Sequence, residues 1–402
     1  MLLQLLNKTV DKIQQLFELK GGISLIYNQK VDFHSHFLSK TYYEYLAEYE
    51  GSKPDDFPTP KWSAEGHIKL MDNLGIAFAF LSVSFPNLSK AEKEKEISLV
   101  HKVNDEGAQI VSGHTDRFGL FASLPLPHED AAIKEARYAL ETLKADGFGL
   151  STHYAGVYLG DKRYDRLMAY LDSVGAVIAV HPVKPAGLPN GVNSELPIPA
   201  MEFFMDTTRT FTNMVMNNIF LRFPNIKWIF PHAGAFLPIL SDRINGFAMQ
   251  FRAGLSVPAP IDYKSDMKRV YFDVAGFPLN KQLHDLLLDV SVENLLYGSD
   301  APYTPDIACI AQTGGLESVS GLSKADKENV FTFNAVRLVP RLKNILNINV
   351  QGNSVSYTNK PLTFPERTRR AVRTVISKLY YIQLFLHKVT VQIAMVLRTV
   401  ST

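Results

Sequence analysis

Two histidines at the end of an apolar run give the first sign of chemistry in this chain. His34 and His36 flank Ser35, and in a β-strand the side chains at positions i and i+2 point to the same face. Two imidazoles on one face can bind the same divalent metal ion. A lone histidine is more often a packed or solvated residue, so a metal site needs further ligand-type residues downstream.

Such residues follow other apolar runs. His181, His232 and Asp300 each come at or just after the end of a short β-rich segment. Eight segments of this kind lie at residues 29–33, 76–83, 118–124, 147–152, 177–180, 228–230, 270–274 and 295–296. Amphipathic stretches lie between most of them, and this alternation predicts a (β/α)8 TIM barrel. Because the C-terminal strand ends of such a barrel meet at one mouth, we expect these residues to form one metal-centred site there.

Composition limits what can hold the metal. The 402 residues are 46% hydrophobic, which is enough for a large core, and the net charge of +2 favours no nucleic-acid partner. Cys309 is the single cysteine, which excludes an internal disulfide and a multi-cysteine zinc site and fits a reducing, cytoplasmic compartment. The metal ligands must therefore be histidines and carboxylates.

Both ends differ from the central segment 27–350 that we assign to the barrel. Residues 1–26 begin with an amphipathic helical pattern broken by charges, unlike a signal peptide, and no window reaches the length of a membrane-spanning helix. Residues 351–402 read as a linker followed by a basic amphipathic helix. That helix either lies on an anionic membrane surface or packs on the barrel or across an oligomer interface.

Four ordered motifs suggest a family. They are Asp-Phe-His-Ser-His at 32–36, Val-His-Pro at 180–182, Phe-Pro-Asn at 223–225 with Phe-Pro-His-Ala-Gly at 230–234, and Tyr-Gly-Ser-Asp-Ala-Pro at 297–302. In these motifs the chain resembles the amidohydrolase superfamily, within it the branch of aminocarboxymuconate-semialdehyde decarboxylase and the aromatic-acid decarboxylases. The resemblance covers about residues 31–342.

A narrower resemblance is to the 6-methylsalicylate decarboxylase group. It rests on Trp62-Ser63, Met71-Asp72, Phe-Ala-Ser-Leu-Pro-Leu-Pro at 121–127, Gly-Val-Tyr-Leu-Gly-Asp at 156–161 and Asp-Thr-Thr-Arg at 206–209. Pocket residues can change while such framework segments remain, so the substrate inference is weaker than the metal inference.

The resemblance implies one divalent metal ion, zinc or manganese, bound by His34, His36, His181 and Asp300. It implies that His232 stands beside the metal as an acid/base group. Binuclear relatives carry a bridging lysine on strand four, whereas residues 147–152 contain none. Relatives in this branch are commonly oligomers, so we expect a homo-oligomer.

The activity that the resemblance implies is non-oxidative decarboxylation of a hydroxybenzoic-type acid. The metal would chelate the carboxylate and its ortho hydroxyl, and His232 or Asp300 would deliver a proton to the ring carbon. The same ligands could instead activate water for hydrolysis of a lactone or amide. A third reading is a non-catalytic membrane-associated or scaffolding module, against which the intact ligand set argues.

Four residues are candidates for binding the substrate. Arg209 and Lys184 carry charges that suit a carboxylate, whereas Phe277 and Tyr303 suit a planar ring. Lys184 departs from the small polar residues expected in the methylsalicylate group, and Phe277 is bulkier than the matching residue in relatives. We read His153, near the same mouth, as a pocket or rim residue.

Overall fold

Eight parallel strands form the central sheet of the computed structural model, which describes residues 29–192, 195–251, 262–279, 281–351, 354–357, 375–380 and 382. The strands are ordered β1-β2-β3-β4-β7-β8-β9-β10, so each pairs with the next strand of the barrel along the chain. Their bounds are β1 (Lys30–His36), β2 (Ile76–Ser82), β3 (Phe118–Ala122), β4 (Gly147–Ser151), β7 (Val177–His181), β8 (Lys227–Phe230), β9 (Tyr271–Asp273) and β10 (Leu295–Leu296). The predicted (β/α)8 barrel is confirmed.

Backbone hydrogen bonds close the barrel between its last and first strands. Phe33 N donates to Tyr297 O over 2.9 Å, and His36 N donates to Ala301 O over 2.8 Å. Asp300 N donates to His34 O over 2.7 Å. Closure thus places Asp300 beside the two histidines of β1.

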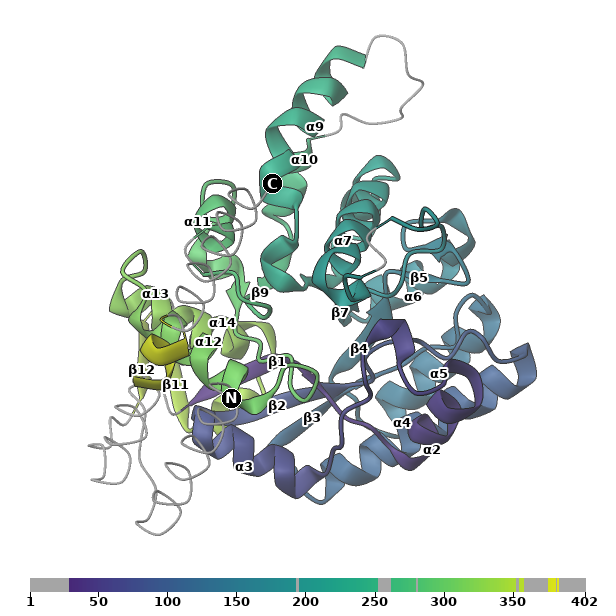
Figure 1. Cartoon of the computed structure of the whole chain (residues 1–402), viewed down its shortest axis with the longest axis horizontal. Helices are drawn as coiled ribbons and strands as arrows, with labels where there is room; N and C mark the ends of the chain where they lie inside the picture. The colour runs from purple at the N-terminus through teal and green to yellow at the C-terminus, as the bar shows by residue number, and fades with distance from the viewer. Residues whose placement is uncertain are drawn as a thin grey trace, which may run out of the picture.

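Helices surround the ring of strands (Figure 1). Local signals define their ends: in α3 the Ser63 side chain accepts a hydrogen bond from Gly66 N, and Gly75 ends the helix with a φ of 69° that suits glycine. The longer helices are α3 (Ala64–Leu74), α4 (Lys93–Ser112), α5 (Glu129–Glu141), α6 (Asp165–Ser173), α7 (Ile198–Met216), α9 (Leu237–Phe251) and α12 (Asp306–Ser318). The shorter ones are α2 (Lys40–Tyr45), α8 (Ile219–Arg222), α10 (Tyr263–Met267), α11 (Gln282–Leu286), α13 (Lys324–Glu328), α14 (Asn334–Leu338) and α15 (Leu342–Ile345).

Aromatic side chains fill the lower part of the barrel. The rings of Phe80 and Phe121 stack with their centroids 4.8 Å apart, and Phe33 lies 4.6 Å from Phe80. Val336 of α14 packs in the same buried cluster. This apolar plug leaves the C-terminal end of the barrel for polar groups, as in other barrels of this type.

The structure adds strand residues to those predicted from the sequence at two places. β1 continues to His36 because its last residues pair with β2, so both histidines lie within the strand rather than after it. Near the end of the segment assigned to the barrel, β11 (Ile348–Gln351) pairs antiparallel with β12 (Ser354–Tyr357), a hairpin that the sequence did not predict. Alternating apolar residues such as Ile348 and Val350 suit this pairing.

Most of the predicted terminal helices fall outside the described residues. The N-terminal helix at 1–26 lies wholly outside them. Of the basic C-terminal segment, residues 375–380 are described and are helical. Within the described ranges, no helix combines the length and the apolar character needed to cross a membrane.

Candidate metal centre and active site

Three histidines and one aspartate meet at the C-terminal end of the barrel. His34 and His36 lie at the end of β1, His181 ends β7, and Asp300 follows β10. One potential ligand atom from each of them lies within 4.8 Å of those of the other three. Asp300 Oδ1 lies 3.4 Å from His34 Nε2 and 3.5 Å from His36 Nε2. The four side chains therefore converge on a volume that one metal ion would fill.

The other ring nitrogen of each histidine has a partner that fixes its orientation. His181 Nδ1 lies 2.8 Å from the carbonyl oxygen of Pro182, which can only accept, so this nitrogen carries the hydrogen. His34 Nδ1 donates in the same way to Asp273 Oδ2 over 2.9 Å. His36 Nδ1 lies 3.1 Å from the Ser82 hydroxyl, which itself donates to a backbone carbonyl and so accepts from His36. With Nδ1 protonated in all three rings, Nε2 is the metal-binding nitrogen.

Unsatisfied polar atoms show that these residues fit a cation. The Nε2 atoms of His34 and His36 are buried and have no hydrogen-bond partner among the described residues. Buried polar atoms without partners are rare in native proteins and call for an explanation. Three imidazoles and a carboxylate form a donor set typical of a mononuclear zinc or manganese site.

The pKa shifts agree with this interpretation. Burial opposes protonation of His34, but Asp273 and Asp300 outweigh it and raise the pKa of His34 well above its usual range. Burial lowers the pKa of His36 and of His181. Burial disfavours the charged form of Asp300, yet the nearby His34 and His36 lower its pKa. These directions favour a positive charge beside Asp273 and Asp300, and a bound metal ion would replace the proton on His34.

His232 stands beside this cluster without joining it. It follows β8, and its ring centroid lies 5.0 Å from that of His34, while its ring stacks on Phe204 at 5.5 Å. Its Nδ1 is buried with no hydrogen-bond partner among the described residues. Burial and the neighbouring His34 lower the pKa of His232 to about 4, so its imidazole is neutral near pH 7. A neutral ring with an unpaired nitrogen can accept a proton from, or relay one to, a bound molecule.

Asp273 was not assigned a role from the sequence. Its Oδ2 accepts from His34 Nδ1, and its Oδ1 accepts from the backbone N–H groups of His232 and Ala275, each over 3.1 Å. One buried carboxylate therefore positions both a metal ligand and the candidate acid/base group. Its place at the end of β9 was the available signal, since the ligands also lie at or beyond strand ends.

Asp32 has a comparable positioning role. Its Oδ1 accepts from His34 N over 3.0 Å and from Ser299 N over 3.1 Å. These bonds tie β1 to the segment that carries Asp300. Burial raises the pKa of Asp32 to about 7.

A wide pocket of about 560 Å³ opens above the cluster. His181, His232 and Asp300 supply polar groups to it, whereas aromatic and small apolar side chains supply most of the rest. Among the described residues that line it, none is a lysine or an arginine. The negative charge of an acid bound here must therefore be neutralised by a metal ion at the end of the pocket that His181 and Asp300 line.

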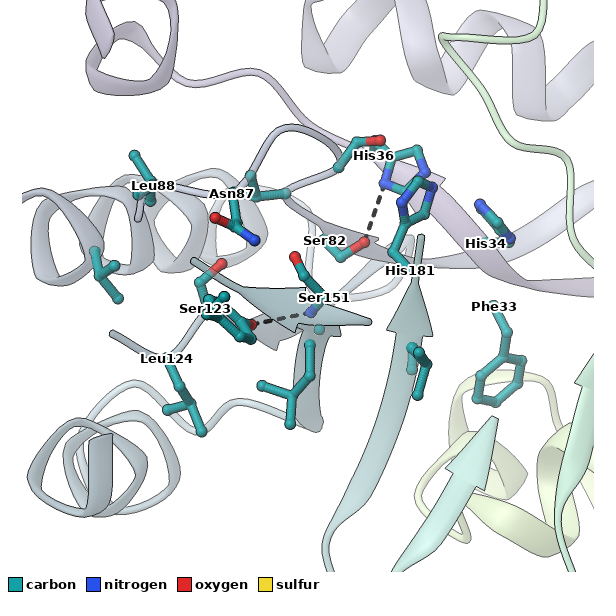
Figure 2. A pocket seen from close by; sticks show the side chains of 18 of the residues that line it. Phe33, His34, His36, Ser82, Asn87, Leu88, Ser123, Leu124, Ser151 and His181 are labelled. Atoms are coloured by element: carbon teal, nitrogen blue, oxygen red, sulfur yellow. Dashed lines mark hydrogen bonds between the residues drawn. The ribbon is translucent and has the colours of Figure 1, made fainter. Parts of the chain in front are cut away.

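A second, much smaller cavity lies inside the barrel. Figure 2 shows Ser82, Ser123 and Ser151 below the rings of His36 and His181. Its volume of about 30 Å³ leaves room for water molecules but not for an aromatic acid. The wide pocket is thus the candidate substrate site.

The two aromatic candidates from the sequence line this pocket. Tyr303 is 6% exposed and donates a hydrogen bond to Phe85 O over 3.3 Å. Phe277 is 42% exposed and has a φ of 61°, a conformation that bulky residues rarely adopt. Both are placed to contact a planar ligand.

The two basic candidates do not reach the pocket. Arg209 is exposed on α7 and does not line the pocket, although Asp206 of the same helix is buried and accepts hydrogen bonds from Thr152 and Tyr158. Lys184 is also exposed, and its carbonyl oxygen lies 3.0 Å from Nε2 of His153. Arg209 and Lys184 therefore place no positive charge at the metal cluster.

Comparison with known proteins agrees with this geometry. The profile of the amidohydrolase family matches residues 31–341. The 6-methylsalicylic acid decarboxylase of Penicillium expansum is 30% identical over 323 residues, which cover 79% of this chain and 98% of that protein. A solved structure of a protein named amidohydrolase II is 39% identical, with a TM-score of 0.74 over 78% of this chain and all of that one.

A more distant solved structure shares the fold. It is a dihydroxybenzoic acid decarboxylase from Polaromonas sp. JS666 with bound manganese and the inhibitor 2-nitroresorcinol, 21% identical with a TM-score of 0.68 over 78% of this chain and 97% of that one. Since the family profile spans most of the barrel and includes all four converging residues, the chain belongs to the amidohydrolase family.

Proposed function

We propose that this chain is a metal-dependent, non-oxidative decarboxylase of a hydroxybenzoic-type aromatic acid similar to 6-methylsalicylate. The observation that carries the proposal is the contrast within one pocket. His181 and Asp300 of the three-histidine, one-aspartate cluster line one end of it, while its walls are largely aromatic and apolar and hold no lysine or arginine among the described residues. The decarboxylase relative from Penicillium expansum, whose length the match covers almost fully, supports the same reaction.

His34, His36, His181 and Asp300 would hold one divalent ion, for which we propose zinc, with manganese as the alternative. When bound, the ion supplies a Lewis acid for the carboxylate and ortho hydroxyl of the acid. Three histidines with one carboxylate suit zinc, while the Polaromonas relative contains manganese. Metal loading followed by elemental analysis distinguishes the two.

The residues of the chain would orient the acid and handle its proton. The aromatic walls, including Phe85 and Tyr303, would hold the ring so that the carboxyl group faces the histidines. The bond from the ring to the carboxyl carbon then breaks, its electron pair stays on the ring carbon, and that carbon takes a proton as CO₂ leaves. His232 or Asp300 would first take a proton from the bound acid and then deliver it to this carbon, because both line the pocket beside the ligand cluster.

CO₂ release tests the proposal. Protein reloaded with zinc or manganese is given 6-methylsalicylate, salicylate and 2,6-dihydroxybenzoate, with chelator-treated protein as the control. Metal-dependent release from at least one acid is expected. No release from any acid, with bound metal verified, would refute the decarboxylase and favour metal-dependent hydrolysis of a lactone or amide.

Two variants separate the proposed roles. His34→Ala should empty the metal site, whereas His232→Asn should keep the metal and lose most turnover. Loss of metal from His232→Asn would contradict the assignment of His232 as a group beside the ion.

A further inference from the structure

A residue from outside the family match lines the candidate substrate pocket. Tyr380 belongs to the described C-terminal helical segment at 375–380, whereas the family profile ends at residue 341. Its side chain lines the same pocket as His181, His232 and Asp300. The C-terminal extension therefore contributes to a pocket otherwise built by the barrel.

Tyr380 reaches the pocket by stacking on Phe277. The two ring centroids are 5.8 Å apart, and the ring planes are nearly parallel at 12°. Such a contact buries apolar area and holds both rings in one orientation. It gives Phe277, which is 42% exposed, a partner for one face of its ring.

Phe277 in turn is tied to the catalytic end of the pocket. It follows Gly276, where an added Cβ would lie 2.7 Å from His232 Cδ2, so this backbone packs directly against the His232 ring. The φ of 61° at Phe277 is unfavourable for a bulky residue and persists only where the surroundings hold it. The contact with His232 and the stack on Tyr380 together hold this conformation at the edge of the pocket.

We propose that Tyr380 is a substrate-binding residue, and that with Phe277 it forms an aromatic wall against which the ring of the acid packs while its carboxylate faces the metal ligands. This inference rests on the proposed function. It names the ligand class as an aromatic acid with one polar edge, since the polar groups of the pocket come mainly from His181, His232 and Asp300. It also assigns part of substrate binding to a segment that the family match does not include.

The test uses the full-length, metal-loaded chain. The variants are Tyr380→Ala, Tyr380→Leu, which keeps apolar bulk, and Tyr380→Phe, which keeps the ring. Leu379→Ala is the matched control, because Leu379 is 46% exposed on the same helical segment and does not line the pocket. Calorimetry gives the Kd of salicylate and of 2-nitroresorcinol, and CO₂ release from 6-methylsalicylate gives kcat and KM.

Loss of the ring should weaken binding while leaving the chemistry in place. Tyr380→Ala and Tyr380→Leu should raise Kd and KM about 3- to 10-fold, the range expected for one aromatic contact, with kcat changed by less than about twofold. Tyr380→Phe should recover most of the loss, and Leu379→Ala should behave as wild type. A merely structural role would instead lower metal content or thermal stability without this split between KM and kcat.

The outcomes distinguish this inference from the proposed function. If wild-type protein binds salicylate but releases no CO₂ from any acid, the proposed function fails, and the Kd series still decides the role of Tyr380. If Tyr380→Ala and Tyr380→Leu match Leu379→Ala in Kd, the aromatic wall is refuted. Failure of the metal-loaded wild type to bind either probe would also refute it.

Discussion

Asp273 provides the sharpest test of how this site prepares its metal ligands. Its Oδ2 accepts from His34 Nδ1, which leaves His34 Nε2 free to face the cluster. In Asp273→Asn the side-chain oxygen can keep the two backbone N–H groups of His232 and Ala275, so the amide NH₂ turns toward His34. That group donates rather than accepts, so His34 must give up the hydrogen on Nδ1 and carry it on Nε2, where it blocks metal binding.

The size of the effect follows from the burial of this hydrogen bond. The side chains of His34 and Asp273 are 3% and 4% exposed, and their atoms are 2.9 Å apart. A hydrogen bond to a charged group contributes about 1.5–3 kcal/mol, and water does not screen a buried one. At about 1.4 kcal/mol per tenfold change, metal affinity should fall about 10- to 100-fold, the range known for such outer partners of metal-bound histidines.

Competition of apo protein with a fluorescent zinc chelator measures this change. Ser82→Ala is a matched control, because it removes a neutral partner of another ligand, His36, and should weaken metal binding about tenfold at most. Circular dichroism verifies that both variants are folded. If folded Asp273→Asn binds zinc within about threefold of wild type, the reasoning about the His34 tautomer is wrong.

Three further predictions concern the fold and the site. Burial raises the pKa of Glu96 from 4.5 to about 8, so between these pH values the folded chain holds a proton that the unfolded chain has lost. The free energy of unfolding should therefore fall as pH rises across this interval. In Glu96→Gln, whose side chain cannot ionise, urea titrations at several pH values should show a fall that is less steep by up to about 1.4 kcal/mol per pH unit. Phe121→Ala removes a buried ring stacked on Phe80 and should lower the free energy of unfolding in urea by about 3–5 kcal/mol. A loss below about 1 kcal/mol would argue against the apolar plug. Gly298→Ala would place a Cβ 2.7 Å from Cβ of His34, so turnover should drop about 10- to 100-fold with the fold intact, and unchanged CO₂ release would contradict this packing.

Strand-end residues are the part of the site that the sequence predicts well. A strand alternates its side chains strictly, and a parallel barrel gathers its C-terminal strand ends at one mouth. His34, His36 and His181 lie at strand ends, and Asp300 follows the last strand of the barrel. Their convergence therefore follows from topology alone, before any side-chain contact is known.

Residues that act through tertiary contacts are not predictable in this way. Arg209 has the right charge for a carboxylate, but the packing of α7 on the barrel leaves its side chain exposed and outside the pocket. Asp273 has no local pattern that distinguishes an orienting carboxylate from a metal ligand. Tyr380 lies more than a hundred residues from Phe277 in the sequence, so no local pattern relates them, and only the folded chain brings the two rings together.

Three residues of the candidate pocket share a left-handed backbone conformation. His232, Phe277 and Asp300 have φ values of 56°, 61° and 60°, and each follows a different strand, β8, β9 or β10. Residues other than glycine adopt this conformation at a cost of about 1–3 kcal/mol each, and the described chain also has it away from the site, as at Lys144 and Asn218. Two of these residues are the candidate proton donors, and the third is the residue on which Tyr380 stacks. Their place in one pocket, together with this conformation, groups Phe277 with His232 and Asp300, and this is the structural reason to treat the aromatic wall as part of the active site rather than as surface packing.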